Sequence, residues 1–116
     1  MSDKYIVYHN PRCSKSRMAV EYLTNEGKSI EIVEYLKEIP SKKELTDILK
    51  KLNIPAEKLI RKGESDYKAN FKGEDLSDAQ WIDAMIQFPK LIERPIVIKE
   101  GKAVIARPAE RIVDLD

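Results

Sequence analysis

The stretch that decides the fold is residues 4–35, which read KYIVYHNPRCSKSRMAVEYLTNEGKSIEIVEY. Four consecutive aromatic or aliphatic residues at positions 5–8 are typical of a buried strand. Apolar residues at helical spacing follow, with Ser14 or Ser16 as the expected cap and Gly27 as the expected stop. The largely alternating residues 30–35 predict a second strand, parallel to the first across a right-handed connection.

The only cysteine of the chain, Cys13, lies at the turn between this strand and this helix. The first N–H groups of a helix are unpaired, and the helix dipole places partial positive charge there. Arg12, Lys15 and Arg17 add further positive charge. A lone cysteine is often a small buried hydrophobe, but polar and charged neighbours do not suit a core residue. We therefore predict that Cys13 is a thiolate nucleophile.

The middle of the chain is expected to be helical. Residues 41–44 form a capping box, followed by apolar residues at helical spacing, and residues 77–80 form a second one. Between them, residues 55–61 predict a short helix that ends at Arg61. We assign these helices to the core and give them no chemistry.

The C-terminal third returns to strands, at residues 95–98 and 103–105, joined by a hairpin at residues 99–102. Pro108 is expected to open a final helix, whose residues Ile112, Val113 and Leu115 pack on the sheet. The order predicts an α/β fold of the thioredoxin or glutaredoxin type. A mixed four-stranded sheet carries a helical insert, about residues 41–92, between its two halves. The whole chain, 1–116, is expected to be one domain.

Composition excludes several classes of function. The 116 residues are 42% hydrophobic and 35% charged with a net charge of +1, so nothing favours nucleic acid or an anionic membrane. Neither a secretory signal nor a membrane span is evident. One cysteine and one histidine cannot build a convincing metal site. Since one cysteine forms no internal disulfide, we expect a reducing, cytoplasmic location.

Three arginines, Arg61, Arg94 and Arg107, each lie in an apolar stretch of the sequence. A guanidinium in such surroundings needs a carboxylate or an anionic ligand. Its planar fork suits tetrahedral oxyanions, because it donates two parallel hydrogen bonds. Each arginine taken alone has the alternative of pairing with a structural carboxylate. Pro95, directly after Arg94, is also a candidate for a cis peptide bond.

Several separated segments in the same order resemble the glutaredoxin-coupled arsenate reductases, the ArsC family, over nearly the full length. The segments are residues 8–17, 59–62, 92–97 and 107–108. The resemblance implies that Cys13 attacks arsenate and that Arg61, Arg94 and Arg107 hold the oxyanion and stabilise the thiolate. It also implies that His9 supports the loop and that Ser16 hydrogen-bonds the sulfur, while Arg17 is a further supporting residue.

On this resemblance the chain is expected to reduce arsenate to arsenite, without a bound cofactor. Glutathione and then glutaredoxin would supply the electrons, since the chain has no second cysteine. Two alternatives remain open. One is a thiol-stress regulator of the Spx branch that binds RNA polymerase, although Ser16 stands where those proteins typically carry a second cysteine. The other is a glutathione-dependent oxidoreductase with a different substrate.

Overall fold

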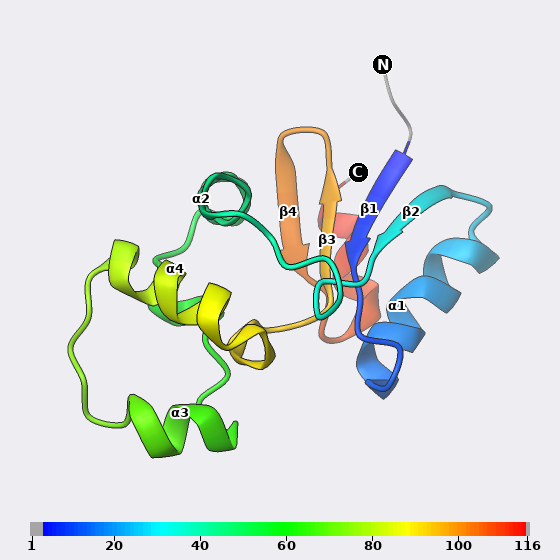
Figure 1. Cartoon of the computed structure of the whole chain (residues 1–116). Helices are drawn as coiled ribbons and strands as arrows, with labels where there is room; N and C mark the ends of the chain where they lie inside the picture. The colour runs from blue at the N-terminus through cyan, green and yellow to red at the C-terminus, as the bar shows by residue number, and fades with distance from the viewer. Residues whose placement is uncertain (1–3, 116) are drawn as a thin grey trace. The chain divides into compact units, whose positions relative to one another are not determined.

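The computed structural model describes residues 4–115, which divide into two compact units (Figure 1). The first unit consists of residues 4–38 and 94–115, and the second is Ile39–Glu93. The second unit contains the predicted helical insert. That the whole chain behaves as one domain stays a prediction.

The first unit is built on a mixed sheet, as predicted. Among the described residues it has four strands in the order β2-β1-β3-β4, with β2 parallel to β1 and the other two pairs antiparallel. The strands are β1 (Lys4–Tyr8), β2 (Ser29–Val33), β3 (Ile96–Lys99) and β4 (Lys102–Ile105). The predicted hairpin joins β3 to β4, and its positive φ falls on Glu100, at 55°. The α/β, thioredoxin-like fold is therefore confirmed.

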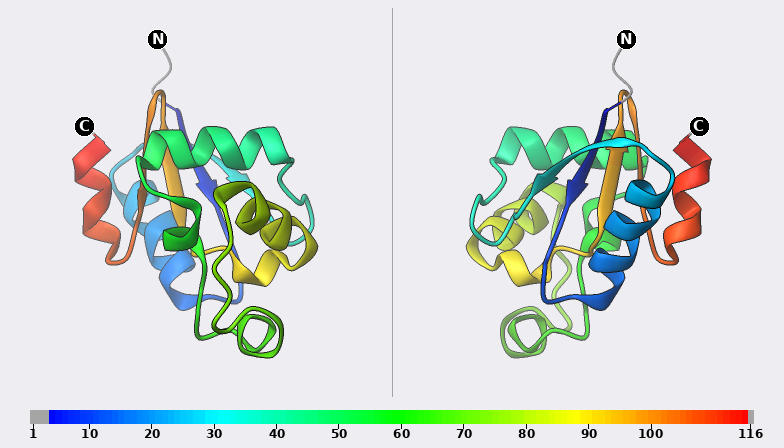
Figure 2. Two further views of the ribbon diagram at one scale, coloured as in Figure 1. Left: turned by 90° about the vertical axis from the view of Figure 1, so that its left-hand side faces the viewer. Right: turned by 90° about the vertical axis from the view of Figure 1, so that its right-hand side faces the viewer.

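One face of this sheet is covered by the helix α1 (Ser14–Asn25) and the 3₁₀ helix η3 (Ala109–Leu115), as Figure 2 shows. Burying apolar side chains between these layers is the main stabilising contribution. The buried residues are Tyr5, Val7, Ala19, Leu23, Val97, Ala106, Ile112 and Leu115. Gly27, with φ of 72°, ends α1 as predicted, because the N–H groups of residues 27 and 28 bond back to Thr24 and Leu23.

Three expectations for this unit are corrected. The residue at the N-cap of α1 is Cys13, and neither Ser14 nor Ser16 occupies that position. The final helix is a 3₁₀ helix that begins at Ala109, after a cis bond between Arg107 and Pro108. Its residue Val113 is 52% exposed, so it does not pack on the sheet.

The second unit consists of short helices. They are α2 (Lys42–Leu52), η1 (Ala56–Leu59), α3 (Ser65–Asn70), α4 (Asp78–Gln87) and η2 (Pro89–Leu91). Helix α4 contacts α2, η1 and η2. Its Trp81 is buried and stacks on Tyr67, with ring centroids 6.3 Å apart. The predicted helix at 55–61 is shorter than expected, since η1 ends at Leu59 and leaves Arg61 in a turn.

Both predicted capping boxes are confirmed. At the start of α2, the Glu44 backbone N–H donates to Ser41 Oγ at 3.1 Å, and the Ser41 N–H donates to the Glu44 carboxylate at 3.0 Å.

Replacing Ser41 by Ala is expected to lower the free energy of unfolding by about 1 kcal/mol, because an N–H at the helix start loses its acceptor. Urea unfolding followed by circular dichroism measures this. Ser65→Ala, at the exposed first position of α3, is the control and should change little.

No helix in the part of the chain that the structure describes is long and apolar enough to span a bilayer.

Candidate active site

Cys13 is presented by a hydrogen-bonded turn between β1 and α1. The Cys13 backbone N–H donates to the Asn10 carbonyl at 2.9 Å, and the Arg12 N–H donates to Asn10 Oδ1 at 3.0 Å. Asparagine stabilises such turns through its side chain, and Pro11 supplies the fixed φ that the turn needs. The turn places Cys13 at the N-cap of α1, half-buried, with extended backbone angles.

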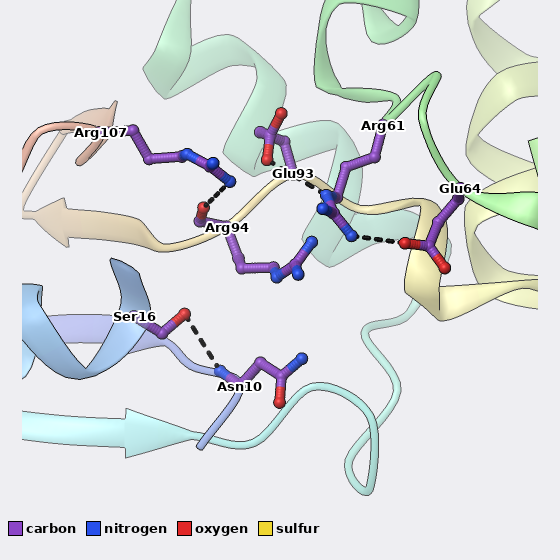
Figure 3. A network of polar contacts seen from close by, with 7 residues as sticks. All are labelled: Asn10, Ser16, Arg61, Glu64, Glu93, Arg94 and Arg107. Carbon is purple, nitrogen blue, oxygen red and sulfur yellow. Dashed lines mark hydrogen bonds and ion pairs between the residues drawn. The ribbon is translucent and has the colours of Figure 1, made fainter. Parts of the chain in front are cut away.

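Three further contacts fix this loop. The His9 N–H donates to the Val33 carbonyl at 2.9 Å, which continues the pairing of β1 with β2. Arg17 Nη1 donates to the Pro11 carbonyl at 2.8 Å. The Asn10 N–H donates to the hydroxyl oxygen of the buried Ser16 at 3.4 Å (Figure 3). Arg17 and Ser16 therefore both hold the turn that carries Cys13.

The surroundings of Cys13 favour its thiolate. Burial raises the pKa of the thiol, but the other influences together outweigh it and leave the pKa below its ordinary value. They are the Ser16 backbone N–H, the positive charge of Arg94, the Lys15 backbone N–H and the Ser16 hydroxyl. The side chain makes no capping hydrogen bond of ordinary geometry, so the two backbone N–H groups act on the sulfur mainly through their dipoles.

This arrangement predicts the pH dependence of Cys13 reactivity. Alkylation by iodoacetamide should rise with pH about a midpoint below that of a free cysteine, which titrates near 8.5. In Ser16→Ala the midpoint should move upward, and the rate at pH 7 should fall about twofold to tenfold, because one hydrogen bond to the anion is lost. The rate at a pH above both midpoints should be nearly unchanged. An unshifted midpoint in Ser16→Ala would contradict the role given to the hydroxyl.

His9 follows β1 directly and is only 8% exposed. Burial lowers the pKa of its imidazole, Glu34 opposes this, and the charge of Arg17 lowers it further. The ring is therefore neutral at pH 7. Its Nδ1 atom is buried and has no hydrogen-bond partner among residues 4–115. Its burial and the bond of its N–H to Val33 fit the loop-supporting role expected from the sequence.

Arg94 and Arg107 lie at the same end of the sheet as the Cys13 loop. Tyr8, the last residue of β1, pairs with Ile96 at the start of β3, and Ile96 pairs with Ile105 at the end of β4. The end of β1, the start of β3 and the end of β4 therefore meet. Arg107 Nη1 donates to the Arg94 carbonyl at 3.4 Å (Figure 3).

The peptide bond between Arg94 and Pro95 is cis, as the sequence analysis allowed. Arg94 is half-buried and Arg107 is exposed. The first unit therefore brings two guanidinium groups to the end of the sheet at which the Cys13 loop lies. The charge of Arg94 acts on the sulfur. A thiolate beside guanidinium groups can attack an electrophilic centre that bears negatively charged oxygens.

Arg61 belongs to the second unit, where it pairs with two carboxylates. Its Nη1 atom lies 2.6 Å from Glu64 Oε2, and its Nε atom lies 3.5 Å from Glu93 Oε1. From the sequence, each arginine had the alternative of pairing with a structural carboxylate, and Arg61 does so.

Sequence reasoning missed Asn10, Glu64 and Glu93. The Asn-Pro pair is a recognised turn signal and could have identified Asn10. The spacing of three residues between Arg61 and Glu64 is a weaker signal, because an ion pair at that spacing is typical of a helix and these residues form a turn. Nothing in the sequence links Glu93 to Arg61. In the described residues, no group of three or more His, Cys, Asp or Glu side chains could hold a metal ion.

A mixed sheet of this topology, with one cysteine at the start of its first helix, defines a thioredoxin-fold protein that lacks a second cysteine. Residues 8–115 match the ArsC family. The uncharacterized protein YfgD of Escherichia coli is 42% identical over 117 residues, covering 99% of this chain and 98% of that protein. An arsenate reductase of Haemophilus influenzae is 42% identical, covering 95% and 97%.

Among solved structures, an arsenate reductase from Vibrio cholerae superposes with a TM-score of 0.93 at 36% identity, over 100% of both chains. The chain belongs to the ArsC family.

Proposed function

We propose that this protein is an arsenate reductase, which converts arsenate to arsenite. The observation that carries the proposal is the thiol of Cys13 at the N-terminus of α1, whose pKa is lowered with a contribution from Arg94. A relative that shares 42% of its residues over nearly the whole chain bears the name arsenate reductase. The class of substrate fits the chemistry, since a thiolate beside arginines suits a small oxyanion.

The first step is attack of the Cys13 thiolate on arsenic. A sulfur–arsenic bond forms, an arsenic–oxygen bond breaks, and the oxygen leaves as hydroxide, or as water once it is protonated. Arg61, Arg94 and Arg107 hold the remaining oxygens and stabilise the charge that develops on them. Ser16 stabilises the thiolate before attack, while His9 and Arg17 keep the loop in place.

The electrons come from outside the chain. Reduction of arsenic(V) to arsenic(III) takes two electrons, which two external thiols supply as they become a disulfide. Water then cleaves the bond between Cys13 and arsenic(III), which releases arsenite and regenerates the thiolate. In total, arsenate and two thiols give arsenite, a disulfide and water. We propose glutathione and then glutaredoxin as these thiols, and the cytoplasm as the compartment, because it keeps thiols reduced. The scheme uses no bound metal or organic cofactor.

The proposal is tested by arsenate-dependent oxidation of NADPH in the presence of glutathione, glutaredoxin and glutathione reductase. Turnover should require arsenate and both thiols, and should stop when glutaredoxin is omitted. Turnover without glutaredoxin would leave the reductase activity standing but overturn the choice of electron donor. No turnover with arsenate, together with recovery of RNA polymerase subunits from a lysate, would replace the enzyme by a binding protein.

A further inference from the structure

The guanidinium of Arg61 is occupied by the carboxylates of Glu64 and Glu93 (Figure 3). All three side chains are partly buried, with 24%, 23% and 27% of their surfaces exposed. Partial burial strengthens an ion pair relative to one in bulk water, because the surroundings screen it less. The group carries one positive and two negative charges, so its net charge repels an oxyanion.

The backbone holds Arg61 and Glu93 side by side. The Arg61 N–H donates to the Leu91 carbonyl at 2.7 Å, and the Glu93 N–H donates to the Leu59 carbonyl at 2.8 Å. The two bonds flank an antiparallel bridge between the buried Ile60 and Ile92. This short ladder fixes the backbone positions of Arg61 and Glu93.

Glu64 reaches Arg61 differently. A turn in which the Glu64 N–H donates to the Arg61 carbonyl at 3.2 Å brings it back onto the arginine. Glu64 is also the N-cap of α3, but its side chain makes no capping hydrogen bond. The favoured N-cap residues are Ser, Thr, Asp and Asn, whose short side chains reach the first N–H groups of the helix. Glutamate is not among them, and here its carboxylate contacts Arg61 at 2.6 Å.

We propose that Glu64 is a specificity-determining residue that competes with the oxyanion for Arg61. The inference rests on the proposed function, in which Arg61 binds substrate. A tetrahedral oxyanion binds a guanidinium best through two parallel N–H groups, and Glu64 already accepts from Arg61 Nη1 at 2.6 Å. The oxyanion therefore gains that bidentate contact only when Glu64 gives way. Glu64 is the stronger competitor, because Glu93 lies 3.5 Å from Arg61 Nε.

The test measures binding of arsenate, and of phosphate as an unreactive analogue, by isothermal titration calorimetry. Glu64→Gln should tighten binding of both anions about threefold to tenfold, because the competing charge is removed. Glu64→Ser, which places a favoured N-cap residue at the start of α3, should do the same. Glu57→Gln is the matched control. It removes one carboxylate from an exposed pair, Glu57 with Lys62 at 2.9 Å, and should change affinity much less.

A double-mutant cycle identifies the route of the effect. In an Arg61→Gln background, Glu64→Gln should no longer tighten binding, because no guanidinium remains to be released. Weaker binding in Glu64→Gln, a gain equal to that of Glu57→Gln, or no anion binding by the wild-type protein would each overturn the proposal. The coupled turnover assay is read separately. Anion binding with the expected variant effects but without turnover would remove the reductase function and leave the competition intact.

Discussion

Cys13→Ser is expected to lower arsenate-dependent turnover to the background rate of the coupled assay. The hydroxyl that replaces the thiol has a far higher pKa, so no comparable anion forms near pH 7 and the sulfur–arsenic bond cannot form. The loss should exceed about a thousandfold, as is usual when the nucleophile of a covalent mechanism is removed. The measurement is NADPH oxidation with glutathione and glutaredoxin at saturating concentrations.

The variant should remain folded, because serine is a favoured N-cap and Cys13 is only half-buried. Its thermal unfolding should occur at or slightly above the wild-type temperature. Anion binding should persist, since the arginines are untouched. Wild-type turnover in a folded Cys13→Ser protein would show that another group attacks arsenate.

Arg94→Gln should lower kcat/KM for arsenate by more than about a hundredfold. Two losses combine: the oxyanion loses a charged donor, which by itself costs on the order of a hundredfold, and the thiolate loses a positive charge that lowers its pKa. The second loss is measured separately as an upward shift in the pH midpoint of iodoacetamide alkylation.

Two variants make this result specific. Arg111→Gln removes an exposed arginine of η3 in the same unit and should leave kcat/KM and the alkylation midpoint nearly unchanged. Arg94→Lys keeps the charge but not the planar fork. It should preserve most of the alkylation profile while kcat/KM stays low. Equal turnover in Arg94→Gln and Arg111→Gln would remove Arg94 from the site.

Elements with local signals could be predicted from the sequence. The capping boxes at Ser41 and Ser77, the stop at Gly27 and the hairpin after β3 each depend on a few adjacent residues. Helix α3 was missed because it buries none of its residues fully and so lacks an apolar period. The cap of α1 was placed wrongly because propensity favours serine, whereas the Asn10 turn assigns the position to Cys13.

The same distinction between local and long-range signals applies to the candidate site. The position of Cys13 at the start of a helix could be predicted from the residues themselves, and the structure places it at the N-cap of α1. The approach of Arg94 to Arg107 depends on antiparallel pairing between β3 and β4, which the hairpin implies but spacing alone does not. The contact between Arg61 and Glu93 joins residues 32 positions apart (93 − 61). No periodic pattern in the sequence predicts this contact.

Cys13 places a sulfur atom at the N-cap of α1, where most helices have a capping oxygen. Ionisation of the thiol and formation of the helix therefore stabilise each other. The N–H groups of Lys15 and Ser16 lower the pKa of Cys13, and the charge of the thiolate in turn stabilises their dipoles at the helix start. Because the pKa of Cys13 is lower in the folded chain than in the unfolded one, ionisation stabilises the fold at any pH above the pKa of the unfolded chain. That contribution is lost as the pH falls through the pKa of the folded chain. In the proposed reaction, formation of the sulfur–arsenic bond removes the thiolate charge from the start of α1, and regeneration of the thiolate restores it.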